Sequence, residues 1–190
     1  MTTDGDDRLE TERHGAAAPR APAGPVMARR PQPGELDIIS HSEEQTRRLG
    51  ARLGTLLEPG DVLLVTGNLG AGKTVFAQGV AAGLGVTDPV TSPSFILIHD
   101  YKGRLPFYHV DLYRIQSEAE AEALGLEEYL YGDGVTLIEW AERIPGLAPA
   151  SHLAVELRPL TETKRAIRLV ARGERYARLL ADFKRAAFGL

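Results

Sequence analysis

The amino-acid sequence predicts an α/β fold of three layers, built on a mixed sheet that is parallel at its centre and antiparallel at its edges. Strand-like and helical patterns alternate along residues 36–157, as they do where helices join parallel strands. Residues 61–66, DVLLVT, form a continuous apolar run, which is typical of a parallel strand buried on both faces. Alternating apolar runs joined by short polar turns predict the antiparallel strands.

The composition limits the chemistry that is available. The chain has 190 residues and no cysteine. It has room for one ordinary domain, and disulfides, thiolate zinc sites, iron–sulfur clusters and a cysteine nucleophile are all excluded. A net charge of −4 gives no uniform attraction for nucleic acid or an anionic membrane. No run approaches the roughly 18 apolar residues of a membrane span, so we expect a soluble, cytoplasmic protein without a membrane partner.

Charge divides the chain into three segments. Residues 1–35 hold five of the twelve prolines and five Arg against six acidic groups, a net of −1. Such a segment buries too little apolar surface to offset its ordering entropy, so we expect a disordered extension. Residues 36–190 form the predicted domain. Within it, residues 36–157 hold 8 basic and 17 acidic groups, a net of −9, whereas residues 158–190 hold 9 basic and 3 acidic, a net of +6.

The first half of the domain predicts the order strand, helix, strand, helix. A short apolar run at Leu36–Ser40 precedes Ser42, and a Gln follows Ser42 three positions on, which is a capping-box pattern that begins a helix. Leucines at helical spacing continue that helix until Pro59-Gly60 ends it. The strand at 61–66, a glycine-rich turn and a helix from Thr74 to about Leu84 follow.

The second half predicts the edges of the sheet. Phe95–Tyr101 and Leu105–Val110 form a hairpin pattern, and an acidic, alanine-rich helix near Ser117–Leu130 precedes a strand at Val135–Trp140. The hairpin and the C-terminal strands are expected at the edges. The last elements are antiparallel strands that pair Leu153, Val155 and Leu157 with Ile167, Leu169 and Ala171, and a helix from Glu174 to about Phe188.

The glycine-rich turn carries the strongest chemical signal. It reads Gly67, Asn68, Leu69, Gly70, Ala71, Gly72, Lys73, Thr74, a full match to the P-loop pattern G-x-x-x-x-G-K-[ST] between a strand and a helix. Its glycines let successive N–H groups converge on phosphate oxygens, and the next helix points its positive end at the same anion. Lys73 is expected to reach the terminal phosphates, and the Thr74 hydroxyl to bind Mg²⁺. The sequence therefore predicts a P-loop nucleoside triphosphatase fold.

Two carboxylates end other apolar strands. Asp111 ends the run Phe107–Asp111, and Glu139 ends Val135–Glu139. A P-loop nucleotidase uses such an acid to hold its metal directly or through water. The carboxyl ends of these strands and of 61–66 should meet at one edge of the sheet, where the nucleotide would lie. A carboxylate that caps a strand-to-helix junction is the alternative interpretation of either residue.

Three other features have two interpretations each. Thr91-Ser92-Pro93-Ser94-Phe95 suits a loop that senses a γ-phosphate or a metal, and an ordinary polar turn is the alternative. His109 lies on the same face of its strand as Asp111, where it contacts nucleotide or a partner, or serves as a hydrogen-bonded structural group. Arg114 is either an internal arginine finger or the anchor of the following loop.

The order of the motifs resembles the bacterial TsaE (YjeE) family. The motifs are LGAGKT at 69–74, VTSPSF at 90–95, HVDLYR at 109–114 and IEW at 138–140. The resemblance covers roughly residues 36–157, and the last two motifs are more specific than the P-loop. Ser94 stands where the family more often has Thr, so a hydroxyl is retained. Members of this family are the ATPase component of the machinery that makes N6-threonylcarbamoyladenosine (t6A) on tRNA.

The resemblance implies a role for each motif residue. The ATP phosphates would be bound by Gly67, Asn68, Leu69, Gly70, Ala71, Gly72, Lys73 and Thr74. Ser92 and Ser94 would occupy a switch-like loop, and Trp140 would lie near the nucleotide. The ligands of Mg²⁺ would come from Thr74, Asp111 and Glu139, and the catalytic residues would be Glu139, Lys73 and Asp111. A general base, a water-positioning group and an outer-sphere metal partner all stay open for Glu139.

The resemblance also implies partner proteins of the TsaD and TsaB type, with tRNA contacted through them. The basic C-terminal segment either faces tRNA or an acidic partner, or is a solvated surface. A small-molecule kinase is the alternative function, but it needs an acceptor pocket and an arginine-bearing lid. The segment between Tyr113 and Gly134 is acidic and nearly lacks Arg. A GTPase switch is disfavoured because Asn68 is the only asparagine, so no N-K-x-D guanine-reading motif exists.

Overall fold

The computed structural model describes residues 32–92 and 97–189, which form a seven-stranded sheet flanked by helices. The predicted disordered extension, 1–35, lies outside the described residues except for its last four, and the first strand begins within these, at Glu35. The elements in chain order are β1 (Glu35–Ser40), α1 (Glu43–Gly54), β2 (Val62–Thr66), α2 (Lys73–Gly83), β3 (Ile98–Lys102), β4 (Pro106–Asp111), α3 (Glu118–Ala123), α4 (Leu126–Leu130), β5 (Val135–Glu139), the 3₁₀ turn η1 (Ala141–Arg143), β6 (His152–Pro159), β7 (Arg165–Arg172) and α5 (Glu174–Phe188).

The sheet is parallel at its centre, as predicted. Its strand order is β1-β7-β6-β2-β5-β4-β3. β2 pairs in parallel with both β5 and β6, and β4 pairs in parallel with β5. The carboxyl ends of β2, β4 and β5 therefore meet at one edge of the sheet, which is where the sequence predicted the nucleotide.

The C-terminal strands pair in the predicted register but do not form an edge. β6 and β7 are antiparallel, and Leu153, Val155 and Leu157 face Ala171, Leu169 and Ile167. However, β6 lies beside β2 and β7 beside β1, so β1 and β3 are the edge strands. The expectation that the C-terminal strands lie at the edge was wrong. An alternating pattern shows which face of a strand is buried, but not which strand lies beside it.

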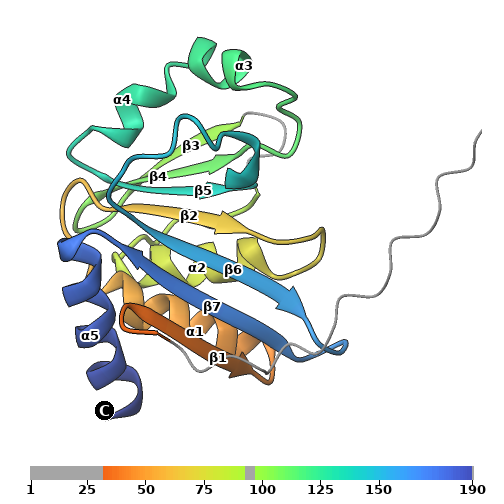
Figure 1. The fold of residues 1–190 in the computed structure, drawn as a ribbon, viewed down its shortest axis with the longest axis vertical. Coiled ribbons are helices and arrows are strands. Elements are labelled where there is room, and N and C mark those ends of the chain that lie inside the picture. Colours follow the sequence, from red (N-terminus) through yellow and green to blue (C-terminus); the bar gives the residue numbers. More distant parts are fainter. Residues whose placement is uncertain (1–31, 93–96, 190) are drawn as a thin grey trace, which may run out of the picture. The chain divides into compact units, whose positions relative to one another are not determined.

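Two hydrophobic clusters fill the two faces of the sheet and give the predicted three layers. α1, α2 and α5 share one cluster with Leu63 and Val65 of β2. α3, α4 and the segment around η1 share the other with Val62 and Leu64. Figure 1 shows α1, α2 and α5 gathered near β1, β7 and β6, and α3 with α4 near β3, β4 and β5. The side chains of β2 alternate between the two clusters, which explains its continuous apolar sequence.

Glycines let α1 and α2 approach closely, which fixes the helix that follows the P-loop. A Cβ on Gly79 would clash with the carbonyl oxygen of Arg47, and one on Gly83 would clash with that of Ala51. The backbones of the two helices are thus in direct contact, as small residues allow. The side chains of Phe76 and Val80 in α2 are buried at this interface.

The predicted helix at Ser117–Leu130 is instead two short helices. α3 ends at Ala123 and α4 begins at Leu126, and Gly125 between them has φ +70°. A left-handed residue ends an α-helix, and glycine adopts this conformation without steric cost. The first helix likewise ends at Gly54, ahead of the predicted stop at Pro59-Gly60, whereas α5 has the predicted bounds. Among the described residues, no helix is both long and apolar enough to cross a membrane.

Candidate functional site

The P-loop leaves β2 at Thr66 and leads directly into α2. Gly67 has φ +141° and Gly72 has φ +98°, and a Cβ on Gly67 would clash with the carbonyl oxygen of Leu157 in β6. Gly72 is the N-cap of α2, with no side chain that caps the helix. The first N–H groups of a helix have no partner within the helix. The turn therefore presents backbone donors and the positive end of the α2 dipole at one point, which suits a phosphate group.

A cavity of about 440 Å³ opens beside this turn. Most of the predicted site residues line it, including Lys73, Ser92, Asp111, Glu139 and Trp140. Gly67 and Asn68 do not line it, but their carbonyl oxygens accept hydrogen bonds from the Lys73 amine. Ser94 lies outside the described residues. The full lining is Glu43, Leu69, Gly70, Ala71, Gly72, Lys73, Thr74, Val75, Ser92, Asp111, Tyr113, Arg114, Glu139 and Trp140.

Lys73 is buried and is held in place by the loop that precedes it. Its Nζ donates to the carbonyl oxygens of Gly67 at 2.7 Å and Asn68 at 3.1 Å, and it lies 3.7 Å from the centre of the Trp140 ring. Burial lowers the pKa of Lys73 from the ordinary lysine value, while the negative charges of Glu139, Glu142 and Asp111 oppose this shift. An ammonium group has three donors, and the two carbonyl bonds leave one for an anion in the cavity.

A chain of hydrogen bonds fixes the Glu139 carboxylate at the end of β5. The Thr74 hydroxyl donates to Glu139 Oε2 at 3.2 Å, and His109 Nε2 lies 2.9 Å from Oε1. A carboxylate is only an acceptor, so His109 carries its proton on Nε2. Both His109 and Glu139 are buried. The carboxylate thus connects the first turn of α2 to β4 and β5.

His109 contacts the site without lining the cavity. It is fully buried, and its ring lies 6.0 Å from that of Phe107, nearly parallel to it. Its Nδ1 has no hydrogen-bond partner among the described residues. Of the two interpretations open at the sequence level, the hydrogen-bonded group is the one observed, and its partner is the predicted catalytic carboxylate.

Asp111 lies opposite Glu139 across the β4–β5 pair. Ser92 Oγ donates to Asp111 Oδ2 at 2.5 Å, and the Tyr113 N–H donates to Oδ1 at 2.9 Å. Asp111 therefore caps the turn after β4, as the alternative interpretation expected, and it also faces the cavity. Its bond with Ser92 ties the predicted switch-like loop to the strand end.

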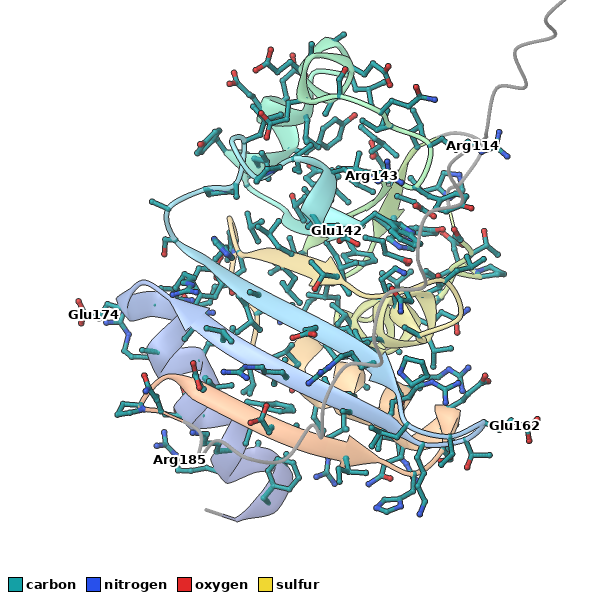
Figure 2. All side chains as sticks on the ribbon, turned by 45° about the vertical axis from the view of Figure 1, so that its right-hand side comes forward. Arg114, Glu142, Arg143, Glu162, Glu174 and Arg185 are labelled. Carbon is teal, nitrogen blue, oxygen red and sulfur yellow. The ribbon has the colours of Figure 1, made fainter. Side chains whose placement is uncertain are left out.

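Trp140 and Tyr113 form an aromatic wall of the cavity. Their ring centres are 5.0 Å apart, and Trp140 has φ +62°. A left-handed backbone is uncommon for a bulky residue and occurs at ligand sites. It turns the chain sharply from β5 into η1, so that the ring covers Lys73. Figure 2 shows Glu142 and Arg143 on η1, and Arg114 on the loop that follows β4.

Two residues that the sequence did not single out support the site. Gln78 of α2 donates from Nε2 to the Val90 carbonyl oxygen at 2.9 Å and accepts from Arg47 Nη2 at 3.2 Å, so it holds the segment that leads to Ser92. Arg165 at the start of β7 packs behind Gly72. Neither lies within a recognisable motif, because each acts on the loops through a contact distant in sequence.

The oxygen donors at the cavity fit Mg²⁺. Thr74 offers a hydroxyl, while Asp111 and Glu139 offer carboxylates, which are the hard ligands that Mg²⁺ prefers. Across residues 32–92 and 97–189, no group of three or more His, Asp or Glu side chains converges on one point. Mg²⁺ commonly takes one or two protein carboxylates and completes its shell with phosphate oxygens and water.

The sheet delivers a P-loop and two carboxylates to the same edge, and this is the arrangement of the P-loop nucleotide-binding proteins. The model of the family described as "Threonylcarbamoyl adenosine biosynthesis protein TsaE" matches residues 40–167. The chain belongs to the TsaE family.

Individual relatives agree with this assignment. The tRNA threonylcarbamoyladenosine biosynthesis protein TsaE of Bacillus subtilis is 43% identical over 143 residues, which cover 75% of this chain and 89% of that protein. The protein of the same name from Treponema pallidum is 43% identical over 129 residues, covering 68% of this chain and 96% of that protein. The crystal structure of YdiB from B. subtilis superposes with a TM-score of 0.71 and 38% identity, covering 80% of this chain and 95% of that one.

Proposed function

We propose that this chain binds ATP with Mg²⁺ and hydrolyses it as the ATPase component of t6A biosynthesis on tRNA. The observation that carries the proposal is the Glu139 carboxylate, fixed between Thr74 and His109 at the edge of the P-loop cavity. The biosynthetic role follows from the family and from the names of its relatives. A role on tRNA agrees with the cytoplasmic location that the sequence predicts.

The phosphates of ATP would be bound by the P-loop. Backbone N–H groups between Gly70 and Thr74, together with the α2 dipole, stabilise an anion at the start of the helix. The third donor of Lys73 points its positive charge at the terminal phosphates. Because Trp140 covers this amine, the lysine is held within the cavity rather than free to reach into water.

Mg²⁺ would be held by Thr74 and by Asp111 or Glu139, where it neutralises charge on the β- and γ-phosphates. Thr74 already contacts Glu139, and Asp111 is placed by Ser92 and by the Tyr113 N–H. These contacts fix the side-chain oxygens before any ligand arrives. Such preorganisation lowers the entropic cost of forming the reactive geometry.

Glu139 would orient the attacking water. His109 fixes one carboxylate oxygen, so the other is directed toward Thr74 and the cavity. A water molecule that donates a hydrogen bond to this oxygen would attack the γ-phosphorus as the bond between that phosphorus and the β–γ bridging oxygen breaks. The products would be ADP and inorganic phosphate. A positioned carboxylate contributes about 10²- to 10⁴-fold to such a step.

The charge of the C-terminal segment supports an indirect contact with tRNA through proteins of the TsaD and TsaB type. Five of its seven arginines form ion pairs within the domain, which offsets part of the positive charge that would attract a phosphate backbone. These ion pairs join Arg158 with Glu156, Arg168 with Glu35, Arg175 with Asp61 and Glu58, Arg178 with Glu174, and Arg185 with Asp182.

Phosphate release from ATP tests the proposal. It should be measured for the wild-type chain and for the Glu139→Gln variant, each alone and with TsaD- and TsaB-type proteins. Glu156→Gln is the matched control, because it removes a half-exposed carboxylate from β6 in the same sheet. We expect hydrolysis that the partners stimulate and that Glu139→Gln lowers about 10²- to 10⁴-fold. Transfer of the γ-phosphate to a metabolite by the isolated chain would instead establish the small-molecule kinase.

A further inference from the structure

Arg165 is a buried cation beside the P-loop. It is the first residue of β7 and is only 8% exposed. Its Nη1 donates to the carbonyl oxygens of Thr161 at 3.2 Å, Glu162 at 2.9 Å and Lys164 at 3.2 Å. Its Nε is buried, with no hydrogen-bond partner in the described part of the chain.

The charge of Arg165 has no carboxylate partner among the residues that the structure describes, where all the ion pairs involve other residues. Glu162 is near in sequence, but Figure 2 shows its side chain at the tip of the β6–β7 hairpin, directed away from the domain. A buried guanidinium that is solvated only by carbonyl dipoles is energetically costly. A nearby anion would offset that cost.

The P-loop is the place where such an anion would bind. A Cβ built on Gly72 would lie 3.6 Å from Arg165 Nε and 3.9 Å from Leu157 Cδ2. Arg165 does not line the cavity, so it stands behind the loop while the cavity opens in front. A polyphosphate bound to the loop would thus lie beside Lys73 in the cavity, with the Gly72 backbone between it and Arg165.

We propose that Arg165 is a positioning residue of the phosphate site, which supports Gly72 and adds a second fixed positive charge that selects for highly charged polyphosphates. This inference rests on the proposed function. At a separation of about 8 Å and an effective dielectric constant of about 20, one unit charge changes the affinity for another by roughly 30-fold. The effect is larger for ATP than for ADP, because ATP carries more negative charge.

The test compares Arg165→Met and Arg165→Lys with a matched control, Arg168→Met. Arg168 lies on the same strand, and it pairs with Glu35 at 2.9 Å, so its loss removes a charge that already has a carboxylate partner. Two quantities are measured for each variant with the full chain. They are the Kd values for ATP and ADP at two salt concentrations, and the melting temperature without nucleotide.

We expect Arg165→Met to weaken ATP binding roughly 30-fold, to weaken ADP binding less, and to reduce the salt dependence of the ATP Kd. Arg165→Lys should stay within about threefold of wild type, and Arg168→Met should bind as wild type does. Without nucleotide, Arg165→Met should melt no lower than Arg168→Met, because an uncompensated buried charge has been removed.

Equal ATP affinity in Arg165→Met and wild type would overturn the inference and leave the proposed function intact. A neutral variant that melts far below the control, or does not fold, would also overturn it, because Arg165 would then serve only to anchor the hairpin. If the wild-type chain bound no nucleotide, the proposed function itself would fail, and this inference with it.

Discussion

The two ends of β2 hold polar groups of opposite character. At the amino end, Asp61 and the N–H of Val62 meet the start of α5. At the carboxyl end, the P-loop meets the ends of β4 and β5. Both clusters are largely buried, and both join elements that are far apart in sequence. They differ in how completely their hydrogen bonds are satisfied, and this difference distinguishes the amino end from the end at which we propose the functional site.

The cluster at the amino end is closed. Arg175 makes a two-pronged contact with Asp61, through Nε to Oδ1 at 3.1 Å and Nη2 to Oδ2 at 2.6 Å. Asp61 also accepts from the Glu58 N–H at 2.8 Å, and the Tyr176 hydroxyl accepts from the Val62 N–H at 2.6 Å. Buried polar groups that are fully partnered specify one arrangement of the chain.

The cluster at the carboxyl end is open. Lys73 keeps a spare donor, and the two buried side-chain atoms without a hydrogen-bond partner in the described residues, His109 Nδ1 and Arg165 Nε, both lie at this end. Unsatisfied buried groups cost stability, and they persist where a ligand or a reaction uses them. Substitutions at the open end should therefore impair function, whereas substitutions at the closed end should impair stability.

Glu139→Gln should give the largest effect. The amide retains the shape but removes the negative charge that orients water, so ATP hydrolysis should fall about 10²- to 10⁴-fold. The free energy of unfolding should change by less than about 1 kcal/mol, because the Gln oxygen can still accept from His109 while its NH2 group donates to the Thr74 hydroxyl. Steady-state phosphate release and urea unfolding measure the two quantities. A large loss of stability would show that Glu139 has a mainly structural role. It would contradict the comparison between the two ends of β2.

Lys73→Met should weaken ATP binding about 10- to 100-fold, since a hydrogen bond from a charged group to phosphate is worth about 1.5–3 kcal/mol. The folded state should not lose stability, because burial opposes the charge of this lysine. Calorimetric titration and thermal unfolding check the two expectations. A variant that binds ATP normally would show that the P-loop holds no triphosphate.

Tyr176→Phe should affect only stability. It leaves the N–H of Val62 buried without its acceptor, which costs about 1–3 kcal/mol, while the ATP Kd should stay that of wild type. Burial raises the pKa of Tyr176 to about 12. Between pH 10 and 12 the folded state therefore binds more protons than the unfolded state, and stability falls as the pH rises. This decline should be smaller in the variant, which unfolding curves at several pH values would show.

The pH dependence of ATP binding should give the smallest effect. Burial lowers the pKa of Lys73, and only the protonated amine attracts phosphate. ATP affinity should therefore begin to fall, as the pH rises, at a lower pH than an ordinary lysine would give. Binding titrations of the wild-type chain from pH 8 upward measure this decline in ATP affinity. If the decline persisted in Lys73→Met, another titrating group would be responsible for it.

The features that could be predicted from the sequence are local. The P-loop between β2 and α2, the register of β6 with β7 and the bounds of α5 each follow from residues that are neighbours along the chain or in one alternating pattern. Asp111 and Glu139 were placed at the same edge because parallel strands bring their carboxyl ends together. The structure puts the two residues opposite each other.

The features that could not be predicted depend on distant contacts. The pairing of His109 with Glu139 and that of Tyr176 with Val62 join residues 30 and 114 positions apart, and neither pair forms a sequence pattern. The place of β6 beside β2 depends on how the sheet is assembled, which alternation does not report. The break at Gly125 was missed because a single glycine inside an alanine-rich run is tolerated in many helices.

The central claim is that t6A biosynthesis depends on the P-loop site at the carboxyl end of β2. Its most direct test is the t6A content of tRNA, measured by nucleoside mass spectrometry, in a bacterial strain that lacks its own TsaE-family protein. The strain should be complemented with the wild-type chain, Glu139→Gln or Glu156→Gln at matched protein levels. We predict that the wild type and Glu156→Gln restore t6A and that Glu139→Gln does not. Full restoration by Glu139→Gln would contradict the account.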